Sequence, residues 1–390
     1  MISATQSSPQ TAASSTDKQY FLGVDVGGTN IKIGLVDDQG QTLGTASIST
    51  LASQPAQQAI DRSAEAARRI VQTAGVEWSN VAAAGLGVPG PMSLPDGQVL
   101  DASNLPGWLN FYAQAALEKA LGMPVCFIND ANAAALGEAW IGAGAGHHSL
   151  AMFTLGTGVG GGLISDGHLI DGIHCNSFGS EMGHMVVDSS RDARLCVWGG
   201  GRGQLEAFAS ASAVAAQATR GVQSGVDTML CRLEQLRDSA KNGGENGGEH
   251  GGDRSAATKR GQAEEVPIQD KDYVETAADE ITAKDVYLAA KAGDEFALKL
   301  VDEAAYYLGI GVTTAVHLID PGLVLLGGAM NFGGKACPIG RRFLEKVTQE
   351  FQSRTFANVA AGTRIDYATL GGDAGFIGAA AFARQQIQNR

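Results

Sequence analysis

Two short apolar runs near the start of the chain, Phe21–Val24 and Ile31–Val36, flank the polar segment Asp25–Asn30. Each run has the length of a strand, and the adjacent glycines between them allow the backbone to turn sharply. The pattern therefore predicts a β-hairpin with the sequence Asp-Val-Gly-Gly-Thr-Asn at its tip. A further strand is expected over Thr42–Ser49.

Farther along, apolar strand-length runs alternate with segments of helical periodicity, which indicates an α/β architecture. We expect strands at Val81–Val88, Val125–Ile128, Leu150–Thr154 and Leu323–Leu326. We expect helices at 56–75, Asn110–Leu121, Ala131–Gly142, Thr282–Ala292, Glu295–Ile319 and Ala374–Gln388.

The long apolar stretch from Tyr306 to Met330 has the length of a membrane span, but His317, Asp320 and Pro321 interrupt it. A buried helix followed by a core strand explains it better, because proline and the residue before it disfavour helix. No membrane segment is expected. No secretory apolar region follows Met1, and residues 1–19 are expected to form a loose tail.

Composition limits the size of the core, the kind of partner and the cellular compartment. A chain of 390 residues with 44% hydrophobic residues can bury a large core and is expected to form two lobes. The formal net charge of −13, with no basic stripe, argues against nucleic acid as the main partner. The five cysteines follow no even, close spacing, which favours a reduced cytoplasmic compartment. They are residues 126, 175, 196, 231 and 337.

Residues 239–272 differ in character from the rest, since glycine-rich low complexity gives way to mixed charge without apolar periodicity. Such a segment cannot bury enough surface to offset its ordering entropy. A solvated loop extension is the favoured interpretation, and a regulatory insert is the alternative.

A second glycine-rich turn, 155–162, follows the predicted strand Leu150–Thr154. Glycine turns bring backbone N–H groups close to a bound anion, and a carboxylate such as Asp25 can hold Mg²⁺ directly or through water. Thr29 and Asn30 add polar donors. Alone, Asp25–Asn30 is also compatible with an ordinary hairpin turn. Together, the two turns predict a cleft with phosphate-binding loops on both walls.

Asp130 is the strongest candidate for catalysis. It follows an apolar strand and opens a predicted helix, at the edge where ligand crevices of α/β proteins form. A carboxylate there can accept a proton from an attacking hydroxyl during phosphoryl transfer. The alternative is a helix N-cap, for which Asp is well suited. Asn129 beside it and the two glycine turns favour the base.

Several segments occur together in an order that is specific to one family. They are DVGGTN at 25–30, GVPGP at 87–91, SNLPGW at 103–108, INDANAAALGE at 128–138, LGTGVGGG at 155–162 and EMGH at 181–184. Their order and spacing resemble the ROK family of repressors and sugar kinases, within the wider sugar kinase–Hsp70–actin ATPase fold. The resemblance covers residues 20 to 385, outside the insert.

This resemblance implies a two-lobed actin-like ATPase (ribonuclease H-like) fold that closes around a cleft, with ATP against the larger lobe and a hexose between the lobes. The expected small lobe is 20–129 plus 375–390, and the expected large lobe is 130–374. A homodimer is also implied, with ATP, Mg²⁺ and a hexose as the ligands. The charge and the interrupted apolar stretch separately predict that neither nucleic acid nor a membrane is a partner.

Residue roles follow by matching motifs. Asp130 would be the base that deprotonates the sugar hydroxyl. The sugar-binding set would be Asn104, Asn129, Glu181, His184 and Glu206. The ATP- and Mg²⁺-binding set would be Asp25, Gly27, Gly28, Thr29, Asn30, Gly156, Thr157, Gly158, Gly327 and Gly328.

Each sugar-binding assignment has a structural alternative. Asn104 could merely begin the Pro106-Gly107 turn, and Glu206 could lie on an exposed helix face. Glu181 and His184, three residues apart, could simply be neighbours on one helix.

The chain departs from the family at its zinc loop, CxCGxxGCxE. Counting back from Glu206, the three cysteine positions hold Val197, Gly199 and Gln204, and Cys196 lies one position away. Structural zinc needs four nitrogen or sulfur ligands, and only Cys196 and His184 remain nearby. We therefore expect no zinc site, with glycine turns and packing of Trp198 in its place.

The leading functional hypothesis is an ATP-dependent glucokinase. Alternatives are a kinase for N-acetylglucosamine, N-acetylmannosamine, mannose or fructose, or a sugar-sensing transcriptional repressor. The repressor is disfavoured because only 19 polar residues precede Tyr20, and a helix-turn-helix domain needs about 50 or more. Polyphosphate as the phosphoryl donor stays open, though no basic track favours it.

Overall fold

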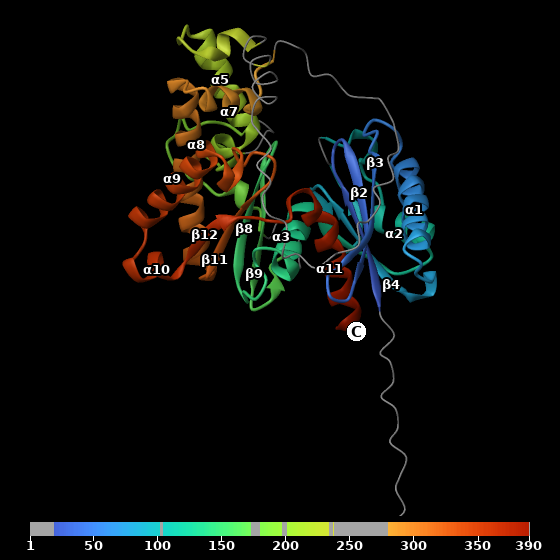
Figure 1. The fold of residues 1–390 in the computed structure, drawn as a ribbon. Helices are drawn as coiled ribbons and strands as arrows, with labels where there is room; N and C mark the ends of the chain where they lie inside the picture. Colours follow the sequence, from blue (N-terminus) through green and yellow to red (C-terminus); the bar gives the residue numbers. More distant parts are fainter. Residues whose placement is uncertain are drawn as a thin grey trace, which may run out of the picture.

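The computed structural model describes residues 19–101, 104–172, 180–196, 201–233, 237 and 280–389. Within them the chain forms two five-stranded sheets, one from its first third and one from its later part, with two helices between them (Figure 1). The predicted tail, except for its last residue, and the predicted insert at 239–272 lie outside the described residues. The lobe boundaries stay a prediction.

The first sheet has the order β3-β2-β1-β4-β7. Its strands are β1 (Tyr20–Val26), β2 (Asn30–Asp37), β3 (Thr42–Ser49), β4 (Val81–Val88) and β7 (Val125–Asn129). β1 and β2 pair antiparallel with Asp25 opposite Lys32, so the predicted hairpin is confirmed. β1, β4 and β7 are parallel, so Asp25 and Asn129 lie near the same edge of the sheet.

Helices cover both faces of this sheet. α1 (Ala56–Thr73) and α2 (Ala113–Leu121) pack on one face, and α11 (Ala374–Gln388) packs on the other (Figure 1). The prediction that a helix begins at Asn110 is wrong by three residues. Asn110 has a positive φ of 54°, and the Phe111 N–H donates to Val99 O, which holds both residues outside the helix.

The second sheet has the order β10-β9-β8-β11-β12. Its strands are β8 (Leu150–Leu155), β9 (Val159–Ser165), β10 (His168–Leu169), β11 (Leu323–Gly327) and β12 (Arg364–Tyr367). The helices of this half are α4 (Glu206–Ala209), α5 (Ala211–Gln223), α7 (Ala283–Lys291), α8 (Glu295–Ile319), α9 (Pro338–Arg354) and α10 (Ala357–Gly362).

The short elements are mostly at turns. They are β5 (Met92–Ser93), β6 (Gln98–Val99), η1 (Trp78–Asn80), η2 (Pro106–Trp108), η3 (Met182–His184), η4 (Met229–Arg232), η5 (Gly334–Ala336) and η6 (Gly371–Asp373).

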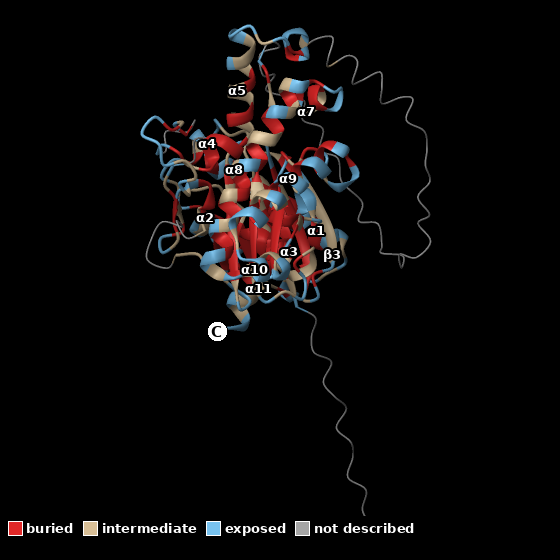
Figure 2. Cartoon of the chain, turned by 90° about the vertical axis from the view of Figure 1, so that its left-hand side faces the viewer, coloured by how far each residue is buried: buried red, intermediate tan, exposed pale blue. Residues whose placement is uncertain are grey.

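The apolar stretch at 306–330 forms the end of α8 and then β11, as expected. α8 ends at Ile319 because Asp320 adopts a left-handed conformation with φ 48°. One face of α8 is buried against the second sheet and its helices, within the large buried core visible in Figure 2. None of the helices in the described parts of the chain has the length and apolar character that a membrane crossing requires.

α3 (Asp130–Ile141) and α11 form the contact between the two halves. α3 packs against β9 and α11 packs against β1 and β4, so the helix pair links the two sheets. Glycines set how closely the helices approach. A Cβ added at Gly378 would lie 1.6 Å from Ala133 O, and one at Gly137 would lie 2.5 Å from Ala374 O.

We predict that Gly378→Ala destabilises the protein strongly, because the new methyl group meets backbone that cannot move aside. Overpacking typically costs about 1–3 kcal/mol, and rigid backbone neighbours favour the upper end of that range. The measurement is urea unfolding of the wild type and the variant. Gly362→Ala is the control, since a Cβ there meets nothing within 4 Å. Equal stability of the two variants would contradict the packing argument.

Candidate functional site

The first glycine turn closes the β1–β2 hairpin. The Gly27 N–H donates to Asn30 O at 3.0 Å, and Thr50 supports the turn from the end of β3 by donating its hydroxyl to Gly27 O at 2.7 Å. Asn104 lies directly over this turn, because a Cβ on Gly28 would be 3.2 Å from its Nδ2. Gly28 is half-buried in the turn and Thr29 is exposed.

The second glycine turn joins β8 to β9. The Gly156 N–H donates to Gly158 O at 3.0 Å. The start of α5 holds the outer side of the turn: the Ala211 N–H donates to Gly156 O at 2.8 Å, and the Ser212 hydroxyl donates to Thr157 O at 2.8 Å. The sequence prediction missed this support, since Ser210-Ala-Ser212 is indistinguishable from any helix start.

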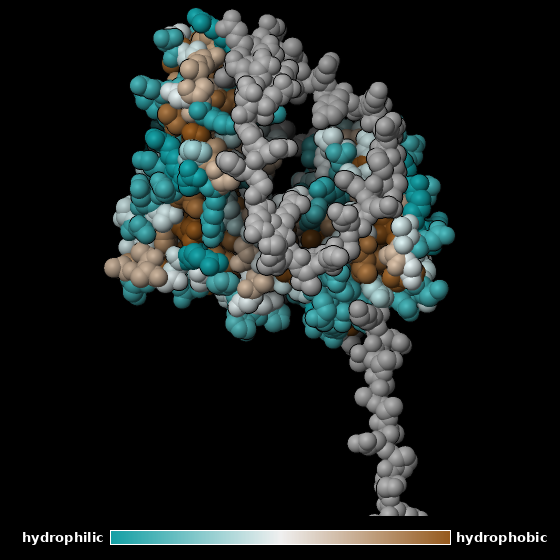
Figure 3. Space-filling view, in the orientation of Figure 1, coloured by the Kyte–Doolittle hydropathy of each residue, from teal (hydrophilic) through white to brown (hydrophobic). Residues whose placement is uncertain are grey.

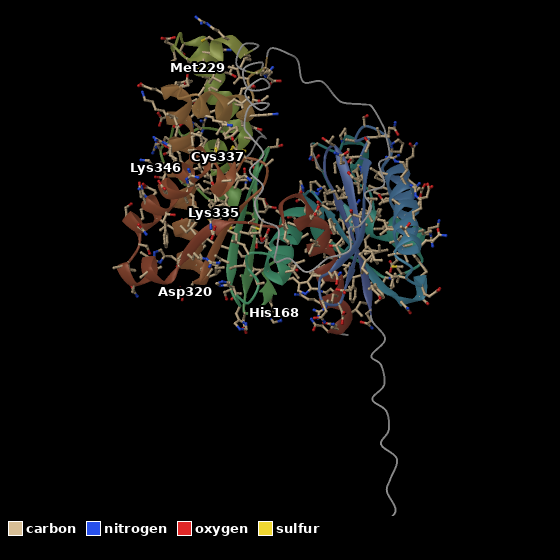
Figure 4. All side chains as sticks on the ribbon, in the orientation of Figure 1. His168, Met229, Asp320, Lys335, Cys337 and Lys346 are labelled. Atoms are coloured by element: carbon tan, nitrogen blue, oxygen red, sulfur yellow. The ribbon has the colours of Figure 1, made fainter. Side chains whose placement is uncertain are left out.

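The Gly327-Gly328 turn lies against the second glycine turn. Gly328 has φ 89°, and a Cβ there would lie 2.2 Å from Leu155 O. The Met330 N–H donates to that same carbonyl at 2.9 Å. The loop beyond continues to Lys335 and Cys337, labelled in Figure 4 on the second-sheet half. Two of the segments predicted to bind ATP are therefore neighbours.

Asp130 is the first residue of α3, and its neighbour is the cap. Asn129 Oδ1 accepts hydrogen bonds from the N–H groups of Ala131 at 3.0 Å and Asn132 at 3.1 Å. The N-cap role considered for Asp130 therefore belongs to Asn129. Asp130 Oδ1 accepts from the Ala131 N–H at 2.8 Å, and the carboxylate also accepts from the N–H of Asp130 itself.

Carboxylates from both halves converge near Asp130. Burial raises the pKa of Asp25 to about 7, and the charge of Asp130 adds to the rise while Lys32 opposes it. Burial also raises the pKa of Asp130. The pKa of Glu181 is raised by burial, opposed by His184, and raised further by Asp130 and Glu206. The charges of these carboxylates therefore act on one another across the two halves.

Glu206 is buried at the start of α4, so the exposed-face alternative is wrong. Its Oε2 accepts from the Val159 N–H at 2.8 Å, at the end of the second glycine turn. Its Oε1 accepts from the Cys196 thiol, with sulfur and oxygen 2.8 Å apart. Cys196 lies in the segment where the chain departs from the family's zinc loop. It therefore contacts a residue of the predicted sugar-binding set directly.

His184 is exposed at the end of η3, and Glu181 immediately precedes this single turn. The two residues are therefore neighbours on one 3₁₀ turn, in which the His184 N–H donates to Glu181 O at 3.1 Å, so the structural alternative is not excluded. Val197, Trp198 and Gly199 lie outside the described residues. Among the residues that are described, no group of three or more His, Cys, Asp or Glu could hold a metal ion. The absence of zinc stays a prediction.

Mg²⁺ imposes a different requirement. It usually keeps several waters and takes one or two carboxylates plus substrate phosphates, so it needs no such group. Asp25 fits that role, because its half-buried carboxylate is acted on by the negative charge of Asp130, which the positive charge of Lys32 opposes.

Contacts and electrostatics thus link predicted residues of both halves. The space-filling view shows an opening between the upper parts of the two halves (Figure 3). Asp25 and Asn104 come from the first half, and Glu181, Glu206 and the second glycine turn come from the other. Lys32 is a residue that sequence reasoning missed. It looks like an ordinary exposed strand lysine, and only the fold places it beside Asp25 and the start of α11.

Comparison with known proteins gives the same picture. The ROK family model matches residues 21–386. The glucokinase of Halalkalibacterium halodurans is 32% identical over 368 residues, which cover 94% of this chain and 96% of that protein. The crystal structure of a ROK family glucokinase from Streptomyces griseus in complex with glucose and AMPPNP is 28% identical with a TM-score of 0.66, covering 94% of this chain and 99% of that one.

A relative of another class is also similar. The xylose repressor of Caldicellulosiruptor bescii is 29% identical over 272 residues, covering 70% of this chain and 55% of the repressor.

The fold and the site define a sugar kinase with the actin-like ATPase fold, a phosphotransferase with an alcohol group as acceptor. The chain belongs to the ROK family.

We predict that Asp25 makes the ligand-free protein less stable as pH rises. A carboxylate whose folded pKa is raised stabilises the fold below its unfolded value, 3.8, and that contribution is lost as pH rises through about 7. Asp25→Asn should therefore gain stability over the wild type between these pH values and hold that gain above them. At about 1.4 kcal/mol per pKa unit the gain is at most roughly 4 kcal/mol.

The measurement is urea unfolding in Mg²⁺-free buffer from pH 4.5 to 8. Asp192→Asn, at an exposed loop position, is the control and should follow the wild type at every pH. A difference between Asp25→Asn and the wild type that did not change with pH would disprove the assignment.

Proposed function

We propose that the protein is an ATP-dependent glucokinase that converts glucose and ATP to glucose 6-phosphate and ADP. The observation that supports this most directly is the position of Asp130. Its buried carboxylate belongs to a cluster that includes Asp25 beside the first glycine turn and Glu206 beside the second. The resemblance to glucokinases over nearly the whole chain supports the same assignment.

In this proposal, the carboxylate of Asp130 accepts the proton of the attacking sugar hydroxyl. As the new bond between the sugar oxygen and the γ-phosphorus forms, the bond from that phosphorus to the ADP oxygen breaks. The burial that raises the pKa of Asp130 makes the carboxylate a stronger base. Mg²⁺, held by Asp25 directly or through water, would neutralise charge on the phosphates.

The two glycine turns hold the phosphates through backbone N–H groups, and Gly327 and Gly328 contact the adenosine. Glycine N–H groups suit this role, because no side chain keeps the ligand away from the backbone. The start of α5 hydrogen-bonds the carbonyl groups of Gly156 and Thr157. In this proposal, those carbonyl oxygens therefore point away from the phosphates.

Sugar recognition falls to Asn104, Asn129, Glu181, His184 and Glu206. Asn129 has its oxygen committed to the helix cap, so its Nδ2 is the group that faces the sugar. Glu206 is fixed at both oxygens, and a fixed carboxylate discriminates between hydroxyl patterns better than a mobile one. A cytoplasmic homodimer that serves glycolysis stays a prediction.

We predict that the purified protein phosphorylates glucose with Mg·ATP. The measurement is a coupled ADP-release assay over glucose, mannose, fructose and N-acetylhexosamines, with product assays for polyphosphate as the alternative donor. Turnover of an N-acetylated sugar but not of glucose would replace the substrate assignment. No turnover of any sugar, together with sugar-dependent DNA binding, would favour a regulator.

We predict that Asp130→Asn folds and binds sugar but turns over very slowly. The substitution keeps the size of the side chain and removes the proton acceptor, and loss of a general base costs about 10²- to 10⁴-fold in rate. Because Asn129 caps α3, the helix start is unaffected. Steady-state kinetics and calorimetry with glucose separate the two effects.

Glu206→Gln is the comparison variant and should weaken sugar affinity more than it lowers kcat. If Asp130→Asn retained more than about a tenth of the wild-type kcat, the base would lie elsewhere.

A further inference from the structure

The buried carboxylate of Glu206 has neighbours on three sides at the second glycine turn. The Val159 N–H donates to its Oε2, and the Cys196 thiol donates to its Oε1 with sulfur and oxygen 2.8 Å apart. Gly158 lies on the third side, because a Cβ there would be 2.2 Å from Oε2. Val159 and Gly158 contribute backbone, whereas Cys196 contributes a side chain from a different segment.

Backbone hydrogen bonds hold the segment that carries Cys196. The Gly203 N–H donates to Arg194 O at 2.8 Å, and the Cys196 N–H donates to Gly201 O at 3.3 Å. Residues on the two sides of this loop are therefore paired with each other. This pairing fixes the backbone from which the Cys196 thiol extends.

The same segment is tied to the helix that begins at Glu206. Arg194 Nη2 donates to Glu303 Oε1 on α8 at 2.6 Å, and the Arg194 guanidinium lies 4.9 Å from the centre of the Phe208 ring on α4. α4 begins at Glu206 and packs against α8, and the two helices lie beside each other in Figure 2. The thiol and the carboxylate are therefore anchored to the same pair of helices.

Two other predicted sugar-binding residues are connected to this arrangement. The Leu205 N–H donates to Met185 O at 2.9 Å, so the residue before Glu206 is paired with the residue after His184. The charge of Glu206 also contributes to the raised pKa of Glu181. A displaced Glu206 carboxylate would therefore change the surroundings of the other residues as well.

The chemistry of the thiol gives Cys196 a role of its own. A thiol that donates to a carboxylate keeps its proton, whereas a cysteine that ligates zinc loses it. An ionised carboxylate has about four acceptor sites. Val159 and Cys196 each take one site, on different oxygens of Glu206. These two contacts therefore set the directions in which the carboxylate can accept from sugar hydroxyls.

We propose that Cys196 is a positioning residue for sugar binding, and that its thiol holds the Glu206 carboxylate in the orientation that meets the sugar hydroxyls. This inference rests on the proposed function, in which Glu206 binds the sugar. Leaving a buried acceptor without its partner is costly. Without the thiol, the carboxylate would therefore turn toward another donor and present different acceptor directions to the sugar.

Three variants separate positioning from packing. Cys196→Ala removes the donor, and Cys196→Ser keeps a donor at the same place. Cys126→Ala is the matched control, since Cys126 is also a buried cysteine but lies on β7, in an apolar cluster of the first half. Each variant is compared with the wild type for glucose affinity by calorimetry, for kcat and KM, and for melting temperature.

Cys196→Ala should weaken glucose binding and raise KM for glucose, each by about tenfold, because a hydrogen bond to a charged group is lost. kcat should fall by less than about threefold, since the proposed base is unchanged. Cys196→Ser should keep glucose affinity within about threefold of the wild type, because a hydroxyl also donates to a carboxylate. Cys126→Ala should lower the melting temperature and keep glucose affinity within about twofold of the wild type.

Metal analysis adds a readout that does not depend on turnover. If the thiol contacts Glu206 directly, the zinc content of the wild type and of Cys196→Ala should be the same. About one zinc per chain in the wild type, lost in Cys196→Ala, would make Cys196 a metal ligand and overturn the inference.

Unchanged glucose affinity in Cys196→Ala would also overturn the inference, as would an equal loss in Cys196→Ala and Cys196→Ser. A wild type that binds glucose without phosphorylating it would refute the proposed kinase activity alone, provided that glucose affinity still depended on the thiol. A wild type that phosphorylates glucose, beside Cys196→Ala with wild-type affinity, would refute the positioning role alone. A wild type that binds no sugar by calorimetry would refute both.

Discussion

Helix α11 lies against the first sheet at distances that leave room only for glycine. A Cβ at Gly23 on β1 would lie 1.8 Å from Phe376 O, and one at Gly85 on β4 would lie 1.9 Å from Ala379 O. On its other side, α11 approaches α3 through Gly378 and Gly137. Because α3 begins at Asp130, the position of the proposed base depends on this stack of backbone contacts, and the fold tolerates little change in it.

The predicted element bounds were most accurate where a strongly periodic or apolar segment was flanked by clear turn or capping residues. β3, β4, α8 and α11 have the predicted bounds. The segment after Gly158 was predicted only as a phosphate turn, yet β9 begins at Val159. Three consecutive glycines have low strand propensity, but α3 lies so close to β9 that a Cβ at Gly162 would be 2.4 Å from that of Ala135. Tertiary packing, which no local pattern reveals, selects the strand.

The candidate site could be predicted as a list of residues but not as an arrangement. The choice between base and cap for Asp130 was open because both need an Asp at a helix start. The structure shows that the side chain of Asn129 takes the cap, and the role of Asp130 as base stays a prediction. Glu206 appeared equally compatible with an exposed helix face. Its burial depends on Val159 and on Cys196, which lie far apart in the chain, so no spacing rule could have indicated it.

Glu206 has a further consequence for how the two ligands sense each other. One of its oxygens holds the Val159 N–H at the edge of the second glycine turn, and the same carboxylate belongs to the proposed sugar-binding set. A sugar that shifts or orders this carboxylate therefore changes the free energy of the glycine turn. Thermodynamic linkage makes the effect reciprocal: by whatever factor the sugar changes affinity for the nucleotide, the nucleotide changes affinity for the sugar. In the proposed site, the side chain of Glu206 would therefore contribute to the binding free energy of both ligands.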